Sequence, residues 1–316
     1  MAPPEIPQNP LHAGTAARPR EDRALLGLAI MVFAVISFTD IDTSGKWLIL
    51  AGIPALQAVF FRYAGHLLLA LLVFLPMQGI GAFRSHRPWL QLLRSILLLS
   101  STILNFLALR HLPVTVTGAI ILATPIALTL LSIPLLGERV GGRRITAVLV
   151  GFLGVLVVLQ PWGTAFHPAM FLSLGGMLAG SLYLIATRYL AGTETNAVSQ
   201  IWSSGLATAL LAPFALSLWV WPETATGYLV IGLAGLFGGL GHMAANVALR
   251  FADASLLAPL IYLQIITAPI ASMLVFDEPP TFWTMIGGLI IAATGLYIWQ
   301  RERRLARANS RVSRDR

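Results

Sequence analysis

Three polar side chains interrupt an otherwise apolar stretch at residues 54–76, namely Gln57, Arg62 and His66. Arg62 and His66 are four residues apart, and Gln57 precedes Arg62 by five, so a helix places them on roughly one side. A guanidinium binds a carboxylate through two parallel hydrogen bonds, and a charge held in an apolar helix points to function by default. Such a polar stripe must face protein or water, so we expect it to line a cavity.

Two carboxylates near the end of the preceding apolar stretch offer a second interpretation of Arg62. Asp40 and Asp42 lie there, with Lys46 just beyond them. A structural ion pair between Arg62 and either aspartate is the alternative to ligand binding. The aspartates themselves fit a proton or substrate gate, or interfacial charges paired with Lys46. We favour the pairing for Asp42 and leave both interpretations open for Asp40.

A second polar group falls in later apolar stretches. His242 and Asn246 are four residues apart and share a helix face, and Asn105 occupies a comparable place earlier in the chain. Amides contributed by both parts of the chain would hold a polar ligand. Hydrogen bonding between helices, worth about 0.6 kcal/mol on average in one membrane protein, is the alternative. No third ligand accompanies the histidines, so we expect no metal site.

Aromatic side chains at Phe38, Tyr183, Trp202 and Tyr262 fall in the same kind of segment. They would suit an apolar or aromatic part of a substrate, with ordinary packing as the alternative. The chain has no cysteine, and no nucleophile–base motif or phosphate-binding glycine loop occurs in it. We therefore expect no catalytic residues, no enzymatic activity and no resident cofactor.

The elements that carry these residues must be membrane-spanning helices. The 316 residues are 57% hydrophobic and 11% charged, against about 25% charged in soluble proteins. A helix crosses the bilayer core with about 20 apolar residues. Ten segments qualify, so the sequence predicts an all-α integral membrane protein with spans at 24–43, 54–76, 88–110, 113–136, 143–160, 168–190, 197–220, 225–249, 253–276 and 281–300.

The distribution of Lys and Arg predicts the orientation of these spans. With both termini in the cytoplasm, only Lys46 and Arg110 fall on outer segments and Arg62 within a span, and the other basic residues face inward. Residues 1–23 are predicted to be a disordered cytoplasmic tail, and 301–316 a basic one. Seven arginines of that second tail follow a span directly, so the net charge of +8 indicates a membrane protein rather than a nucleic-acid partner.

The chain also repeats itself. Ala108-Leu109-Arg110 precedes Glu138 by the interval that separates Ala248-Leu249-Arg250 from Glu278. Halves at 24–160 and 168–300 follow, each with five spans, and an odd number inverts the second half relative to the first. Inverted repeats are typical of secondary transporters, whose binding sites lie where helices break in both halves. Pro125 in the fourth span, and Pro259 and Pro269 in the ninth, mark such breaks.

These motifs resemble the EamA-like branch of the drug/metabolite transporter superfamily. The stretch from Ala123-Thr124-Pro125 to Gly137-Glu138-Arg139 is similar to the end of that family's fourth helix, and Ala268-Pro269 to Asp277-Glu278-Pro279 to its second copy. Asp277 replaces the usual glycine, and we expect the turn to be kept. The resemblance implies a central cavity lined by helices one to four and six to nine, with gating or structural roles for Glu138 and Glu278.

The resemblance also implies a function and leaves its substrate open. Members with different substrates share an arginine at the place of Arg62, which favours the structural role for it. We expect alternating access in a bacterial inner membrane, with export of small metabolites and amino acids first. Uptake of a cofactor resembling S-adenosylmethionine or riboflavin is the alternative, and a membrane scaffold or a membrane-embedded enzyme lies outside transport. The partners expected are a small-molecule substrate and the bilayer, with the chain as a monomer or a homodimer.

Overall fold

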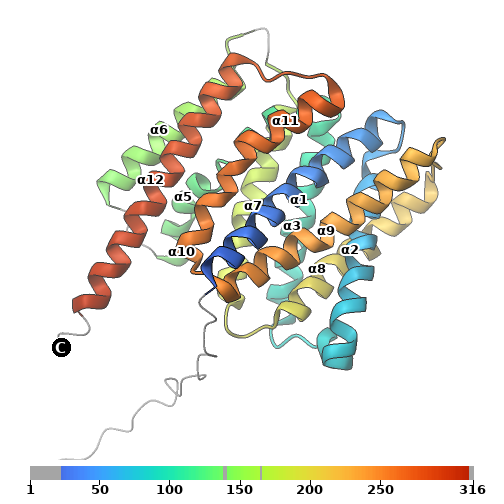
Figure 1. The fold of residues 1–316 in the computed structure, drawn as a ribbon, viewed down its shortest axis with the longest axis horizontal. Coiled ribbons are helices and arrows are strands. Elements are labelled where there is room, and N and C mark those ends of the chain that lie inside the picture. The colour runs from blue at the N-terminus through green and yellow to red at the C-terminus, as the bar shows by residue number, and fades with distance from the viewer. Residues whose placement is uncertain (1–22, 138–140, 164–165, 313–316) are drawn as a thin grey trace, which may run out of the picture.

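The protein is a bundle of helices, seen in a computed structural model that describes residues 23–137, 141–163 and 166–312 (Figure 1). The described residues contain no strand. The first half holds α1 (Ala24–Leu50), α2 (Ala55–Gln78), η2 (Gly79–Phe83), α3 (Pro88–Leu109), α4 (Val114–Ile121), α5 (Thr124–Leu136) and α6 (Gly142–Leu159). The second holds α7 (Met170–Leu190), α8 (Asn196–Ser217), α9 (Ala225–Phe251), α10 (Ala254–Leu257), η3 (Ala258–Leu263), α11 (Gln264–Phe276) and α12 (Phe282–Val312).

The predicted class, an all-α membrane protein, is confirmed. Nine stretches of the described residues are long and apolar enough to cross a membrane. The remaining predicted span, 197–220, is the 22-residue helix α8. Its length suffices at about 1.5 Å per residue, but Gln200, Ser203 and Ser204 make it less apolar. All three are buried, so α8 turns its polar side chains into the bundle and away from lipid.

Helices break at corresponding places in the two halves. The predicted span 113–136 is interrupted after Ile121, and Pro125 stands in the first turn of α5. The predicted span 253–276 begins with α10 and η3, and Pro259 stands in the first turn of η3. Pro269 lies inside α11. A proline lacks a backbone donor and fits the first turn of a helix, so Pro125 and Pro259 mark the broken segments expected near a transport site.

Helices of the two halves pack against each other. The most extensive contacts join α1 with α9, α3 with α7, α6 with α12, and α2 with both α8 and α9; in Figure 1, α1 lies beside α9 and α6 beside α12. Exchanging each span for the one five spans later converts the pair α1–α9 into α3–α7, and leaves α2–α8 and α6–α12 unchanged. It converts α2–α9 into α3–α8, which are also in contact but less extensively. A twofold relation between the halves requires this pattern, while the inverted repeat itself stays a prediction.

Glycines permit the closest helix contacts. A Cβ atom added to Gly65 of α2 would lie 2.5 Å from the Cα of Gly235 in α9. A Cβ on Gly287 of α12 would lie 2.7 Å from the carbonyl oxygen of Gly154 in α6. Small residues let helix backbones approach in this way. These two contacts set how closely the halves meet.

The two ends of the bundle are distinguished by the chain termini. At the termini end α1 begins and α12 ends, and the opposite end, here called the far end, carries the turn between α11 and α12. Asp277 ends α11 there in a left-handed conformation with φ 56°, as Gly137 ends α5 with φ 67°. Aspartate tolerates this conformation better than most residues. The turn expected at Asp277 is therefore present.

Candidate functional site

Arg62 of α2 lies at the centre of a buried polar cluster. Its side chain is 4% exposed. Nη1 is 3.5 Å from Oγ1 of Thr102 on α3, and Nη2 is 3.4 Å from Nε2 of His242 on α9. Both distances are at or beyond the long end of the hydrogen-bond range. Arg62 therefore meets two other helices without being tightly held by either.

Two histidines and an aromatic ring complete the cluster. The rings of His66 and His242 are nearly parallel, with 6° between their planes and 5.7 Å between centroids. His242 also meets the ring of Phe38 on α1 at 5.2 Å, and Nε2 of His66 is 3.1 Å from Oε1 of Gln200 on α8. Four residues predicted as site candidates, Phe38, Arg62, His66 and His242, thus come together from three helices.

Two donor or acceptor atoms of this cluster have no partner. Nε of Arg62 and Nδ1 of His66 are buried, and neither has a hydrogen-bond partner in the described part of the chain. An unsatisfied buried polar atom costs about 1–3 kcal/mol. Polar atoms left in this state at adjacent turns of one helix are available to a ligand.

The two aspartates of α1 make their hydrogen bonds elsewhere. Asp42 accepts from Nδ2 of Asn105 at 2.8 Å, and Asp40 accepts from Oγ of Ser44 at 3.2 Å. Asp42 still lies within electrostatic reach of Arg62. Asp42, one of the two carboxylates expected as an ion-pair partner of Arg62, is therefore close enough to interact with it electrostatically but does not bond it. The hydrogen bonds of Arg62 go to Thr102 and His242.

A second buried arginine, Arg94 of α3, was missed as a site residue. Its guanidinium donates to Oγ1 of Thr187 at 2.9 Å, to the phenol of Tyr183 at 2.9 Å and to Oγ of Ser203 at 2.8 Å. It also lies within electrostatic reach of His242. Its position about six residues inside the predicted span 88–110 was the available signal. The predicted candidate Tyr183 is therefore a partner of Arg94.

Other predicted candidates lie at the two ends of the bundle. Gln57 bonds the backbone of Val220 through both amide atoms, at 2.7 and 3.0 Å, and holds the far end of α2 to the segment after α8. Five residues turn a helix by about 500°, so Gln57 points about 140° away from Arg62. Trp202 donates to the carbonyl of Phe83 at 3.0 Å near the termini end. Asn246 is exposed and bonds the carbonyl of His242 on its own helix at 2.8 Å.

Tyr262 and Pro125 line a separate cavity of about 140 Å³ near the termini end. The cavity lies between α5, α6, α7, η3 and α12, and its lining includes Thr129, Ser132, Arg144, Arg188 and Tyr262. Gly295 of α12 makes room for Tyr262, because a Cβ there would fall 1.7 Å from the phenol oxygen. The broken segments of both halves, at Pro125 and at η3, therefore line the same cavity.

Glu138 and Glu278, the acidic residues of the two turn motifs, were expected to have gating or structural roles, and the structure describes only Glu278. Glu138 lies outside the described residues. Glu278 pairs with Lys46 of α1. The ion pair between Lys46 and Asp42 that we expected from the sequence is therefore not formed. In the described part of the chain no three His, Asp or Glu side chains cluster as metal ligands would. The site is thus built from arginine, histidine and aromatic groups.

Long apolar helices that bury arginine and histidine side chains between them are typical of membrane proteins that move polar substrates or ions. The chain belongs to the EamA-like transporter family, which matches residues 25–160 and 167–299. The two matched ranges begin and end within one residue of 24–160 and 168–300, the halves inferred from the repeated motifs, and the division into two repeats stays a prediction. The predicted family resemblance is confirmed.

Relatives across nearly the whole chain are transporters. A riboflavin transporter of Rhizobium johnstonii is 30% identical over 90% of this chain and 94% of its own. An S-adenosylmethionine uptake transporter of Rickettsia prowazekii is 26% identical over 89% and 94%. A pseudopaline exporter of Pseudomonas aeruginosa is 25% identical over 84% and 93%. A solved crystal structure that is 19% identical shares the fold, with a TM-score of 0.59 over 86% of this chain and 98% of that chain.

Proposed function

We propose that this protein imports a planar, acceptor-rich cofactor of the riboflavin type by alternating access around Arg62. The observation that carries the proposal is the pair of unpartnered buried atoms, Nε of Arg62 and Nδ1 of His66. A flavin-like ring presents carbonyl oxygens and ring nitrogens along one edge. An arginine donates to such acceptors in a fixed planar geometry. Nε2 of His66 donates to Oε1 of Gln200, so the unpartnered Nδ1 of the neutral ring accepts, as from a ring N–H of the ligand.

The aromatic surroundings support a flat ligand. The rings of Phe38, His242 and His66 follow one another across the cluster, with His242 in the middle, at centroid distances of 5.2 and 5.7 Å. Flat rings bind between such groups through stacked or edge-to-face contacts. Because Arg62 and His66 are almost fully buried, the helices must part before a ligand reaches them, as alternating access requires.

S-adenosylmethionine is the second candidate, and one observation favours it. The carboxylate of Asp42 lies near Arg62 and would attract a cationic ligand. Against it, the guanidiniums of Arg62 and Arg94 both lie within electrostatic reach of His242, which makes the centre positive. A sulfonium is repelled there, so we place riboflavin-like compounds first.

Amino-acid export, the first expectation from sequence, is not supported by the relatives. The relatives at 30% and 26% identity are named a riboflavin transporter and an S-adenosylmethionine uptake transporter, and the exporter at 25% identity is named for pseudopaline. Their bacterial sources also support the inner membrane as the location. Import therefore replaces export as the proposed direction.

Counterflow in proteoliposomes tests the substrate. Vesicles are loaded in turn with riboflavin, S-adenosylmethionine or phenylalanine, and exchange of the labelled compound is measured. We expect exchange of riboflavin, reduced about 10- to 100-fold by Arg62→Gln, because a charged hydrogen bond contributes about 1.5–3 kcal/mol. Arg110→Gln, which removes an exposed cation at the far end, is the matched control. Exchange of S-adenosylmethionine alone would favour the second candidate, and exchange of phenylalanine alone would overturn the proposal.

A further inference from the structure

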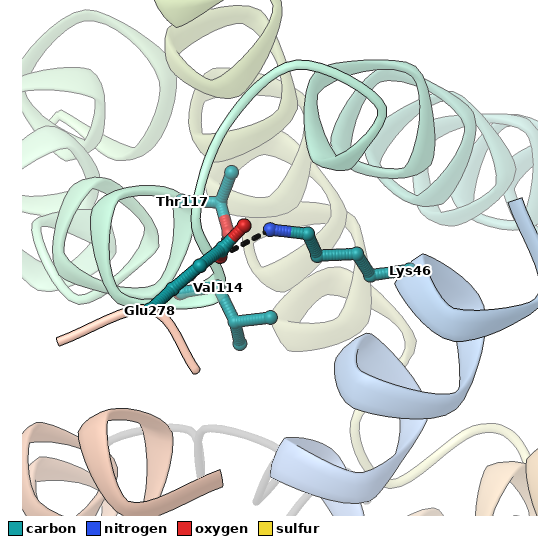
Figure 2. Close-up of polar contacts among 4 residues, drawn as sticks. All are labelled: Lys46, Val114, Thr117 and Glu278. Atoms are coloured by element: carbon teal, nitrogen blue, oxygen red, sulfur yellow. Dashed lines mark hydrogen bonds and ion pairs between the residues drawn. The ribbon is translucent and has the colours of Figure 1, made fainter. Parts of the chain in front are cut away.

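A buried ion pair closes the far end of the bundle. Lys46 of α1 pairs with Glu278, which follows α11, and the side chains are 4% and 34% exposed. Nζ of Lys46 also lies 4.9 Å above the ring of Phe276. Figure 2 shows the pair meeting beside Val114 and Thr117 at the start of α4, both of which are buried. One charge is therefore enclosed, and the other stands at the boundary with solvent.

The pair joins helices that otherwise belong to different packing groups. Lys46 stands on α1, which packs chiefly against α9. Glu278 stands in the turn between α11 and α12, and α12 packs chiefly against α6. Between the two groups, α1 meets α11 along a smaller seam, where Oγ1 of Thr39 and Oγ1 of Thr267 are 2.7 Å apart. The ion pair lies at the outer end of that seam.

The pair also stands directly above the polar cluster. Along α1, Asp42 is one turn below Lys46 and bonds Asn105 of α3. One turn below Asn105 on α3 is Thr102, which contacts Arg62. Asp42, Asn105 and Thr102 therefore lie in succession between the ion pair and Arg62.

We propose that Lys46 and Glu278 are the far-end gate of the carrier, which parts when the Arg62 cluster opens to that side and re-forms when it closes. Taking both charges out of water is costly, and apolar residues of similar volume would join the seam at least as firmly. A charge pair, unlike an apolar contact, is readily hydrated on separation, which suits a contact that must break in each cycle. The inference rests on the proposed function only in assuming alternating access.

The chain has no cysteine, so a single introduced thiol reports opening without background. Thr267→Cys places the thiol on the seam between α1 and α11, opposite Thr39. Thr39 lies about 10 Å further from the far end than Lys46, at 1.5 Å per residue along α1. Labelling by a membrane-impermeant maleimide is followed in right-side-out and inside-out vesicles, so that the far end is addressed in one of them. We expect slow labelling from the far end in Thr267→Cys alone. Adding Glu278→Gln should speed it about tenfold, as expected when an open state rises from a few per cent to a major population.

Two further variants keep the test decisive. Removing one charge leaves the other buried without its partner, so a single substitution risks misfolding. Lys46→Met/Glu278→Gln removes both charges and should also label fast, whereas Lys46→Glu/Glu278→Lys restores a pair and should return labelling toward the slow rate. Arg110→Gln removes a cation at the same end and should leave the rate unchanged. Monodisperse elution in detergent confirms folding of each variant.

A cross-link tests the gate in the opposite direction. Lys46→Cys/Glu278→Cys joined by a short, reducible bifunctional thiosulfonate should stop counterflow, and reduction of the link should restore it. Unchanged labelling in the folded charge-removing variants, or full counterflow with the link in place, would overturn the gate. Failure of every substrate in the counterflow panel would refute the riboflavin proposal alone, because maleimide labelling needs no substrate.

Discussion

The imidazole of His242 on α9 lies parallel to that of His66 on α2, with centroids 5.7 Å apart, and its Nε2 faces the guanidinium of Arg62 at 3.4 Å. One histidine thus connects the second half of the chain to the polar face of α2. A helix movement that separates α2 from α9 would break this contact. The stacked pair therefore couples the site to the packing of the two halves.

Replacing His242 by phenylalanine separates its polar role from its packing role. His242→Phe keeps a ring against Phe38 and His66 but removes the nitrogen near Arg62. We expect counterflow to fall about tenfold, the effect of losing one hydrogen bond to a charged group, with the melting temperature in detergent unchanged. His242→Gln, which keeps a polar atom, should lose less transport. A melting temperature lowered as much by Phe as by Ala would show that the nitrogen stabilises the fold.

Substitution of Arg62 decides between recognition and structure. Because its hydrogen bonds are 3.5 and 3.4 Å long and Nε has no partner, we expect Arg62→Gln to fold normally and to lose transport. Arg62→Lys keeps the charge but not the planar fork, so its transport should remain impaired. Yield of monodisperse protein and counterflow are measured side by side. Loss of folded Arg62→Gln protein would restore the structural role favoured by the sequence.

The crossing of α2 and α9 depends on Gly65. In Gly65→Ala the new methyl would meet the backbone of Gly235 at 2.5 Å, so the helices must move apart. We expect a loss of about 1–3 kcal/mol of stability, typical of overpacking, seen as a lower melting temperature. Gly232→Ala on α9 is the matched control, because nothing lies within 4 Å of its added methyl. Equal melting temperatures of the two variants would contradict the tight crossing.

Gly295 should be intolerant of substitution because of Tyr262. An alanine at Gly295 would place its methyl 1.7 Å from the phenol oxygen, and Tyr262 would leave its position in the termini-end cavity. We expect Gly295→Ala to lower the melting temperature and Tyr262→Leu to restore part of it in the double variant. Gly288→Ala on the same helix should be neutral, since its methyl meets its nearest neighbour at 3.9 Å. Neutral behaviour of Gly295→Ala would show that Tyr262 has another rotamer available.

The predicted orientation is tested by reporter fusions. Both termini should face the cytoplasm, because the arginine-rich segments lie at that end. A reporter that is active only in the cytoplasm should therefore be active when fused after residue 316. The same reporter inserted after residue 222, between α8 and α9, should be inactive. The opposite pattern would invert the protein in the membrane and place the Lys46–Glu278 gate on the cytoplasmic side.

Hydropathy alone located the helices because a bilayer imposes both their length and their composition. The expected segment 54–76 is α2, Ala55–Gln78, and 88–110 is α3, Pro88–Leu109. Helical spacing also placed Arg62 and His66 on one side of α2, since residues four apart share a face. For Gln57, five residues away, the same argument was too coarse, and the structure turns it to Val220 at the far end.

The partners of the polar residues could not be read in the same way, because they depend on which helices meet. The sequence by itself determined the all-helical membrane class and the side of α2 that is polar, because both follow from local composition and periodicity. It also indicated the family, through the resemblance of its motifs at 123–139 and 268–279 to those of known transporters. Only the tertiary structure decided that Lys46 pairs with Glu278, that Asp42 bonds Asn105 and that Arg94 holds Tyr183. These contacts join residues far apart in the chain, and packing between helices, which no local pattern encodes, brings them together.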